Sequence, residues 1–143
     1  MRVSMHLFAA AERYGDIRCA STLILLRHGE SLWNRENRFT GWTDVPLTER
    51  GMREADAAGK KLMEAGLQPD SIHSSVLSRS VQTVRRVQVQ ADRTWLKPEA
   101  SWRLNERHYG ALQGLNKDAA ELIFGGKTVR FWRRSFSGIP PAD

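Results

Sequence analysis

Cysteine and long apolar segments are both scarce in this 143-residue sequence. Cys19 is the single cysteine, so the chain can form neither an internal disulfide nor a cysteine-rich metal site, which favours a reducing compartment. No stretch approaches the roughly 18 consecutive apolar residues that span a bilayer, and the N-terminus has no signal-peptide pattern. We therefore expect a soluble, cytoplasmic protein of one domain with no membrane partner.

Basic runs are also lacking, although the formal net charge is +6 and the isoelectric point is about 10.1. Lysines and arginines occur singly or in pairs, such as Arg133 with Arg134, and no nucleic-acid-binding signature accompanies them. Several arginines lie in segments that also contain His, Glu, Asn and Gly. This pattern favours a small phosphorylated substrate over a nucleic acid as the anionic partner.

Strands and helices alternate along the chain. The apolar run at residues 21–26 is typical of a strand buried on both faces of a parallel sheet. Thr48 can cap a helix that Gly66 closes, with Met52, Ala55, Leu62 and Met63 largely on one face. Residues 1–20 have no clear period, with weak helical character over residues 8–13, and are expected to be a poorly ordered N-terminal extension.

The alternation continues in the second half of the sequence. A short strand is expected at residues 71–74, and Ser74 or Ser75 can cap the helix that follows toward Ala91. A further strand is expected at residues 100–104 and a helix at residues 116–124, ending at two glycines. The pattern predicts an α/β fold for residues 21–143, a three-layer structure with a mainly parallel sheet flanked by helices.

One histidine stands where the first strand of this sheet ends. Open α/β sheets place ligand sites at the carboxyl ends of their strands, so His28 is expected to face a crevice. Gly29 lets the backbone approach a ligand closely, Arg27 offers a guanidinium for phosphate oxygens, and Ser31 and Asn34 add polar contacts. On this spacing alone, a hydrogen-bonded structural histidine is the commoner alternative.

The neighbouring motifs strengthen the catalytic alternative. The segment Arg-His-Gly-Glu-Ser at residues 27–31 is followed by Ser-Val-Leu-Ser-Arg at 75–79, Leu-Asn-Glu-Arg-His-Tyr-Gly at 104–110 and Phe-Trp-Arg-Arg-Ser at 131–135. In this order they resemble the cofactor-dependent phosphoglycerate mutases of the histidine phosphatase superfamily. The resemblance covers residues 22–141, and the second half of it is specific to the mutases.

This resemblance implies a mechanism and a set of site residues. His28 would accept a phosphoryl group from 2,3-bisphosphoglycerate as a phosphohistidine, and Glu106 would act as general acid and base. The implied reaction interconverts 2- and 3-phosphoglycerate in glycolysis and gluconeogenesis. The other expected contacts to the phosphorylated ligand are Arg27, Ser31, Asn34, Thr40, Gly41, Arg79, Arg107, His108, Tyr109, Lys117, Arg133 and Arg134. No metal is expected, because the four histidines show no paired ligand spacing.

Members of the mutase family carry a second active-site histidine on a later strand, in a His-Gly-Asn-Ser-like segment. The present sequence contains no such segment, so the expected domain is incomplete at its C-terminus. Two alternatives to the mutase therefore stay open. One is a bisphosphoglycerate synthase or phosphatase activity, and the other is an inactive remnant that binds phosphorylated ligands. Assembly with a second copy of the chain is also left open.

Overall fold

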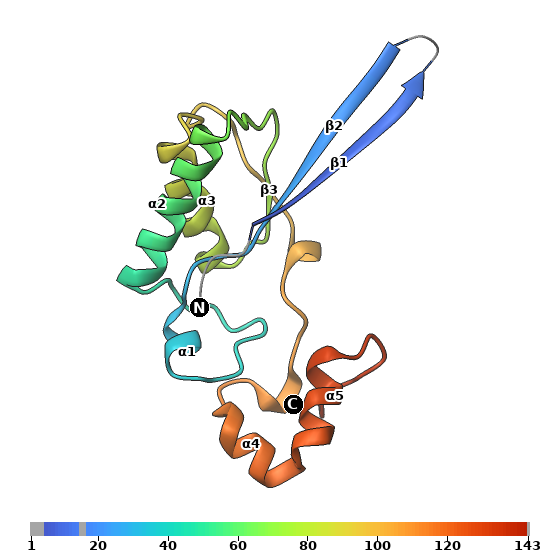
Figure 1. The fold of residues 1–143 in the computed structure, drawn as a ribbon. Coiled ribbons are helices and arrows are strands. Elements are labelled where there is room, and N and C mark those ends of the chain that lie inside the picture. Colours follow the sequence, from blue (N-terminus) through green and yellow to red (C-terminus); the bar gives the residue numbers. More distant parts are fainter. Residues whose placement is uncertain (1–4, 15–16, 143) are drawn as a thin grey trace.

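The computed structural model describes the backbone of residues 5–14 and 17–142, and the side chains of residues 21–142. Figure 1 shows a long hairpin, a central pair of helices and a second helix pair at the opposite end. The elements in chain order are β1 (Met5–Tyr14), β2 (Ile17–Leu26), α1 (Leu32–Arg35), α2 (Glu49–Glu64), β3 (His73–Ser74), α3 (Ser78–Gln90), β4 (Glu99–Ala100), α4 (Lys117–Phe124) and α5 (Gly126–Arg134).

The hairpin formed by β1 and β2 corrects the expectations for the N-terminus. The two strands pair antiparallel, from Met5 opposite Leu26 to Tyr14 opposite Ile17, so helical character over residues 8–13 was a wrong prediction. Pairing with a neighbouring strand outweighs a weak local preference for helix. Residues 1–4 and 15–16 lie outside the described part of the chain, as does the side chain of Cys19.

The expected strand at residues 21–26 is present as the second half of β2, but it is not buried on both faces. Leu23 and Leu25 are 57% and 47% exposed, whereas Ile24 and Leu26 pack against the core. Successive side chains of a strand point to opposite faces, so only one face of β2 contacts the helices.

Helices α2 and α3 pack together beneath β2. Thr48 caps α2 as predicted, accepting a hydrogen bond from the backbone N–H of Gly51, and Gly66 follows the helix with φ of 65°. Leu62 of α2 and Val87 of α3 lie in the shared core, while Met63 is 52% exposed, contrary to its expected place on the buried face. The close fit of the two helices fixes the positions of the loops that precede them.

The parallel pair of strands, β3 and β4, confirms the α/β class. His73 lies opposite Glu99 and Ser74 opposite Ala100, and the chain then turns into a 3₁₀ helix over Trp102–Leu104, where the prediction had extended the strand. Helix α3 begins after Leu77, and no side chain caps its N-terminus. The predicted cap at Ser74 or Ser75 is thus wrong, because the Ser75 hydroxyl instead accepts a hydrogen bond from the N–H of Leu77 itself.

The second helix pair surrounds its own small core. Helix α4 ends at Gly125, as the sequence predicted, and Asn116, which had been expected inside the helix, instead caps it with its side-chain oxygen. Helix α5 was not predicted, because a pair of glycines signals where a helix stops and carries no information about a second helix that starts there. The apolar residues shared by this region are Phe39, Tyr109, Leu112, Ala120, Val129 and Trp132.

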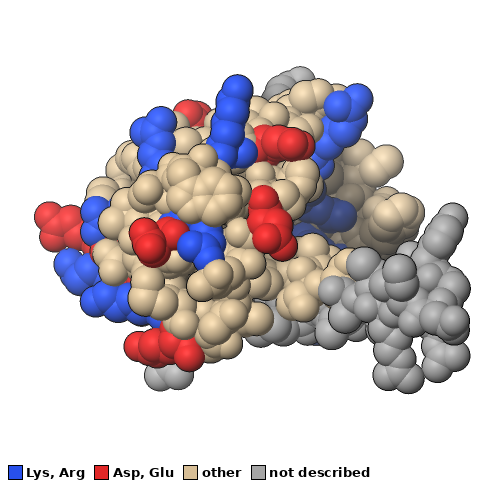
Figure 2. Space-filling view, turned by 90° about the horizontal axis from the view of Figure 1, so that it is seen from above, with Lys and Arg blue, Asp and Glu red and all other residues tan. Residues whose placement is uncertain are grey.

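The surface carries charges of both signs. On the face shown in Figure 2, basic and acidic side chains are interspersed. On α2, Arg50 and Arg53 pair with Glu54 and Glu49 at spacings of four residues, with N–O distances of 3.3 and 3.9 Å. None of the helices in the described part of the chain is both long and apolar enough to cross a membrane.

Candidate active site

The loop that carries His28 is fixed from two sides. From α2, Gly51 meets Gly29 so closely that a Cβ atom on either glycine would collide with backbone atoms of the facing segment. From α3, the Thr83 hydroxyl accepts a hydrogen bond of 3.2 Å from the N–H of Gly29. The next residue, Glu30, is buried, and its carboxylate accepts a hydrogen bond of 2.9 Å from the hydroxyl of Thr48. The main chain beside His28 is therefore held by two helices.

The imidazole of His28 is held as a neutral ring. Burial lowers its pKa to about 4, with smaller contributions in the same direction from Arg79 and Arg27, against a raising effect of the hydrogen bond to Gly29. That bond joins Nδ1 to the Gly29 carbonyl oxygen over 2.7 Å. Because a carbonyl oxygen only accepts, Nδ1 carries the proton and Nε2 keeps its lone pair. A neutral ring with a free Nε2 is a competent nucleophile at neutral pH.

The guanidinium of Arg79 lies beneath the loop that follows α1. Its side chain is 1% exposed and donates hydrogen bonds to the carbonyl oxygens of Gly41 and Thr43, at 2.8 and 3.1 Å. A third bond of 3.3 Å reaches the carboxylate of Glu106. Burial lowers the pKa of Arg79, and the charges of Glu106 and Asp44 oppose that shift. Arg79 thus links the loop to the carboxylate of Glu106, and its charge also acts on His28.

Glu106 is held through its backbone. The indole N–H of Trp42 donates a hydrogen bond of 2.8 Å to the Glu106 carbonyl oxygen, and the Trp42 ring packs near those of Trp102 and His108. The Glu106 side chain is 38% exposed, and its carboxylate contacts Arg79. It is therefore free to meet a ligand while its main chain stays fixed.

Further cationic side chains lie near Arg79 and Glu106. The pKa of Lys117 is lowered by burial, then by the nearby charge of Arg133 and, less strongly, of Arg27. Burial and Glu106 raise the pKa of Tyr109, which is opposed by Arg107, Arg133 and Arg134. The like charges of Lys117, Arg133 and Arg27 repel one another, and a bound anion would relieve this repulsion.

Other residues expected to bind ligand have protein partners. Ser31 and Asn34 form the capping box at the start of α1, each side chain accepting a hydrogen bond of 3.2 Å from the other's backbone N–H. Arg107 donates to the carbonyl oxygens of Trp132 and Ser135 at the end of α5.

Two more of the expected ligand contacts also have neighbours within the protein. His108 Nδ1 accepts a hydrogen bond of 3.0 Å from the N–H of Gly110, and Thr40 is buried beside Gly41. Their roles in ligand binding stay predictions.

Two residues of this region escaped the sequence reasoning. Thr83 follows Arg79 by four residues on α3, a spacing that places both on one helix face and could have indicated it. Gln113 accepts a hydrogen bond of 2.7 Å from the N–H of Trp42, and no local pattern announces that long-range contact.

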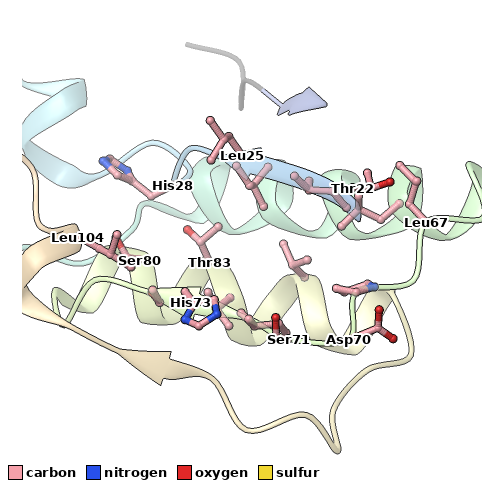
Figure 3. Close-up of a pocket in the computed structure, with 18 of the residues that line it drawn as sticks. Thr22, Leu25, His28, Leu67, Asp70, Ser71, His73, Ser80, Thr83 and Leu104 are labelled. Atoms are coloured by element: carbon pink, nitrogen blue, oxygen red, sulfur yellow. The ribbon is translucent and has the colours of Figure 1, made fainter. Parts of the chain in front are cut away.

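A cavity of about 790 Å³ opens beside His28. Figure 3 shows His28, Leu25 and Thr22 on one side of it, with Thr83, Ser80 and His73 on the other. In the part of the chain that the structure describes, no three His, Cys, Asp or Glu side chains gather in a way that could hold a metal ion.

Comparison with known proteins shows the family of this chain. Residues 23–142 match the histidine phosphatase superfamily (branch 1), and the chain belongs to that superfamily. Over 119 residues it is 56% identical to the 2,3-bisphosphoglycerate-dependent phosphoglycerate mutase of Blochmanniella pennsylvanica (strain BPEN). That match covers 83% of this chain and 51% of the relative, so the chain spans about half the length of the mutase it resembles.

Solved structures give the same fold. A phosphoglycerate mutase from Bacillus anthracis str. Sterne is 26% identical with a TM-score of 0.64, covering 76% of this chain and 49% of its own. A mycobacterial glucosyl-3-phosphoglycerate phosphatase, solved with VO3, is 32% identical with a TM-score of 0.68, covering 79% and 51%. These neighbours confirm the phosphoglycerate mutase-like fold predicted from the sequence.

Proposed function

We propose that this chain carries the phosphoryl-accepting part of a 2,3-bisphosphoglycerate-dependent phosphoglycerate mutase, an isomerase that interconverts 2- and 3-phosphoglycerate in the cytoplasm, in glycolysis and gluconeogenesis. The observation that carries the proposal is the gathering of Arg27, Arg79, Lys117 and Arg133 near a neutral His28 and the carboxylate of Glu106. The 56% identity to a mutase of that name supports it.

The donor set fits a bisphosphorylated carboxylate. Such a ligand needs several cations, and Arg27, Lys117, Arg133 and Arg134 would hold its charged groups while Tyr109 adds a hydroxyl. When bound, 2,3-bisphosphoglycerate supplies the phosphoryl group. Arg79 is better suited to orienting Glu106 and the loop than to wrapping a phosphate, because its guanidinium already makes three hydrogen bonds to protein.

The chain's own residues can perform both halves of a phosphoryl transfer. Nε2 of His28 would form a bond to the phosphorus of a bound donor as the phosphorus–oxygen bond of that donor breaks, and Glu106 would give a proton to the departing oxygen. In the reverse step, the Glu106 carboxylate takes the proton of the attacking hydroxyl. Neighbouring cations stabilise the charge on the phosphoryl oxygens throughout.

Labelling tests the nucleophile. We expect phosphoryl-labelled 2,3-bisphosphoglycerate to leave an acid-labile, base-stable label on His28, and His28→Asn to abolish it. His73→Asn is the matched control, because His73 lines the same cavity and its side chain is more than half exposed. A stable label on serine, or full labelling of His28→Asn, would contradict the assignment.

Kinetics test the separate roles of the acid and the cations. In a mutase assay, Glu106→Gln should lower kcat by roughly 10²–10⁴-fold with a small change in KM. Arg133→Ala should chiefly raise KM. Equal and small effects of both changes would show that these roles are wrongly assigned.

A phosphatase is the second candidate, since a relative at 32% identity is named as one. It would transfer the phosphoryl group from His28 to water, so release of inorganic phosphate without exchange between 2- and 3-phosphoglycerate would favour it. A chain that takes up no label and binds the ligand would instead be the inactive remnant.

A further inference from the structure

The Thr83 hydroxyl lies between the loop of His28 and the helix of Arg79. Thr83 is 3% exposed and lies on α3, one turn beyond Arg79. Its hydroxyl donates a hydrogen bond of 2.8 Å to the carbonyl oxygen of Arg79 and accepts one of 3.2 Å from the N–H of Gly29. A carbonyl oxygen can only accept and an N–H can only donate, so both bonds have one direction and the hydroxyl has no alternative orientation here.

Gly29 transmits this constraint to the imidazole. Its N–H is held by Thr83, and its carbonyl oxygen accepts the Nδ1 proton of His28. Glycine has the most permissive backbone of all residues, so the direction of its carbonyl must be fixed by its surroundings. Gly51 blocks one side through close packing, and the Thr83 hydroxyl supplies the hydrogen bond on the other.

Charge alone does not choose between the two ring nitrogens. The charged groups that act on His28 are Arg79 and Arg27, and together with burial they disfavour the protonated ring. They do not decide which nitrogen of the neutral ring carries the single proton. That choice follows from the hydrogen bond made by one nitrogen, here Nδ1 to Gly29.

We propose that Thr83 is a positioning residue for His28: through Gly29 it fixes the neutral ring with the proton on Nδ1, so that Nε2 stays free to accept a phosphoryl group, and it ties that orientation to the turn that carries Arg79. The importance of a free Nε2 rests on the proposed function, whereas the effect of Thr83 on the ring does not. Both residues line the cavity shown in Figure 3.

The test measures the proton position directly. The 143-residue chain is prepared with ¹⁵N-labelled histidine, and ring nitrogen shifts are recorded at pH 7 by magic-angle-spinning NMR on a hydrated sediment, which does not require a monomer. His28 is assigned by the signals that vanish in His28→Asn. We expect its Nδ1 to be the protonated nitrogen and its Nε2 the unprotonated one.

Three variants separate the hydroxyl from the packing of the helix. Thr83→Val keeps the shape and removes both hydrogen bonds, so the two nitrogen shifts should move toward each other as the tautomers mix. Thr83→Ser keeps the hydroxyl and should restore the wild-type spectrum. Ser80→Ala removes a hydroxyl that lines the same cavity one turn earlier and should change nothing.

The same proteins then report on phosphoryl transfer. With labelled 2,3-bisphosphoglycerate, Thr83→Val should be phosphorylated roughly 10²-fold more slowly, as expected for a misplaced reacting atom, and Thr83→Ser should recover. If no protein takes up label while the spectra behave as expected, the proposed function fails and the inference about Thr83 stands.

Two outcomes would overturn the inference. One is an unchanged His28 tautomer in Thr83→Val. The other is a wild-type ring protonated on Nε2, which needs no variant and so decides the matter even if Thr83→Val does not fold.

Discussion

Lowering the pH should destabilise this protein through His28. The folded chain holds this ring with a pKa of about 4, whereas the unfolded chain has a value near 6.5. As the pH falls from about 6.5 to 4, His28 becomes protonated in the unfolded chain but stays neutral in the folded chain. The free energy of unfolding therefore decreases. The loss is complete below the folded pKa and absent above about pH 7.

The size of this effect follows from the pKa difference. Each unit corresponds to about 1.4 kcal/mol, so the full shift is worth at most about 3.5 kcal/mol, and about 2 kcal/mol is expected between pH 7 and pH 4.5. Folded domains have a stability of about 5–15 kcal/mol, which makes such a change large enough to measure.

Urea unfolding at pH 7 and pH 4.5 gives the measurement. His28→Asn keeps a side chain that can donate to Gly29 and removes the titration, so its free energy of unfolding should fall by about 2 kcal/mol less than that of the wild type over this interval. His73→Asn controls for loss of an imidazole elsewhere. Equal losses in the wild type and His28→Asn, or a His28 pKa near 6.5 in an NMR titration, would refute the reasoning.

Three further changes test the packing. Arg107→Ala removes two hydrogen bonds to the end of α5 and should lower the free energy of unfolding, measured by urea titration, by about 2 kcal/mol. Arg130 is an exposed residue of α5, so Arg130→Ala should leave that free energy nearly unchanged. Leu112→Ala empties a site with 0% exposure and should cost about 2–5 kcal/mol, more than the same change at Leu115, which is 37% exposed; equal costs would contradict the core assignment. Leu122 and Ile123 are 89% and 66% exposed, and this apolar surface should make the chain self-associate in sedimentation velocity. Leu122→Glu should reduce the association more than Lys127→Glu, and a monomeric wild type would argue against this prediction.

Local signals predicted the helices best. Thr48 is a cap whose effect depends on a residue three positions away, so the start of α2 was predicted from the sequence, and the start of α4 was predicted to within one residue. The ends of β2 and β3 were also close to their predicted places. Strand β1 was not predicted, because its conformation depends on pairing with β2 and its own sequence has no clear period. Helix α5 was not predicted, because it packs on residues that are distant in the sequence.

The candidate site shows the same division between local and distant information. Motifs predicted His28, Arg79 and Glu106 as members of one site, and the structure places Arg79 against Glu106 and its charge near His28. Motifs did not separate ligand contacts from structural ones. The capping box of Ser31 and the attachment of Arg107 to α5 use the same residue types that bind phosphate, so only the structure reveals these bonds.

The contact between Gly29 and Gly51 limits how this chain can vary. In an ordinary core pair, a larger side chain at one position can be offset by a smaller one at the other. Here each glycine faces main-chain atoms, which no substitution can shorten, so positions 29 and 51 are closed to compensating exchange. Insertions between them are tolerated only where the lengthened loop returns Gly51 to the same place. The length of the loop between α1 and α2 is therefore limited by the need to keep Gly51 of α2 against the segment at Gly29.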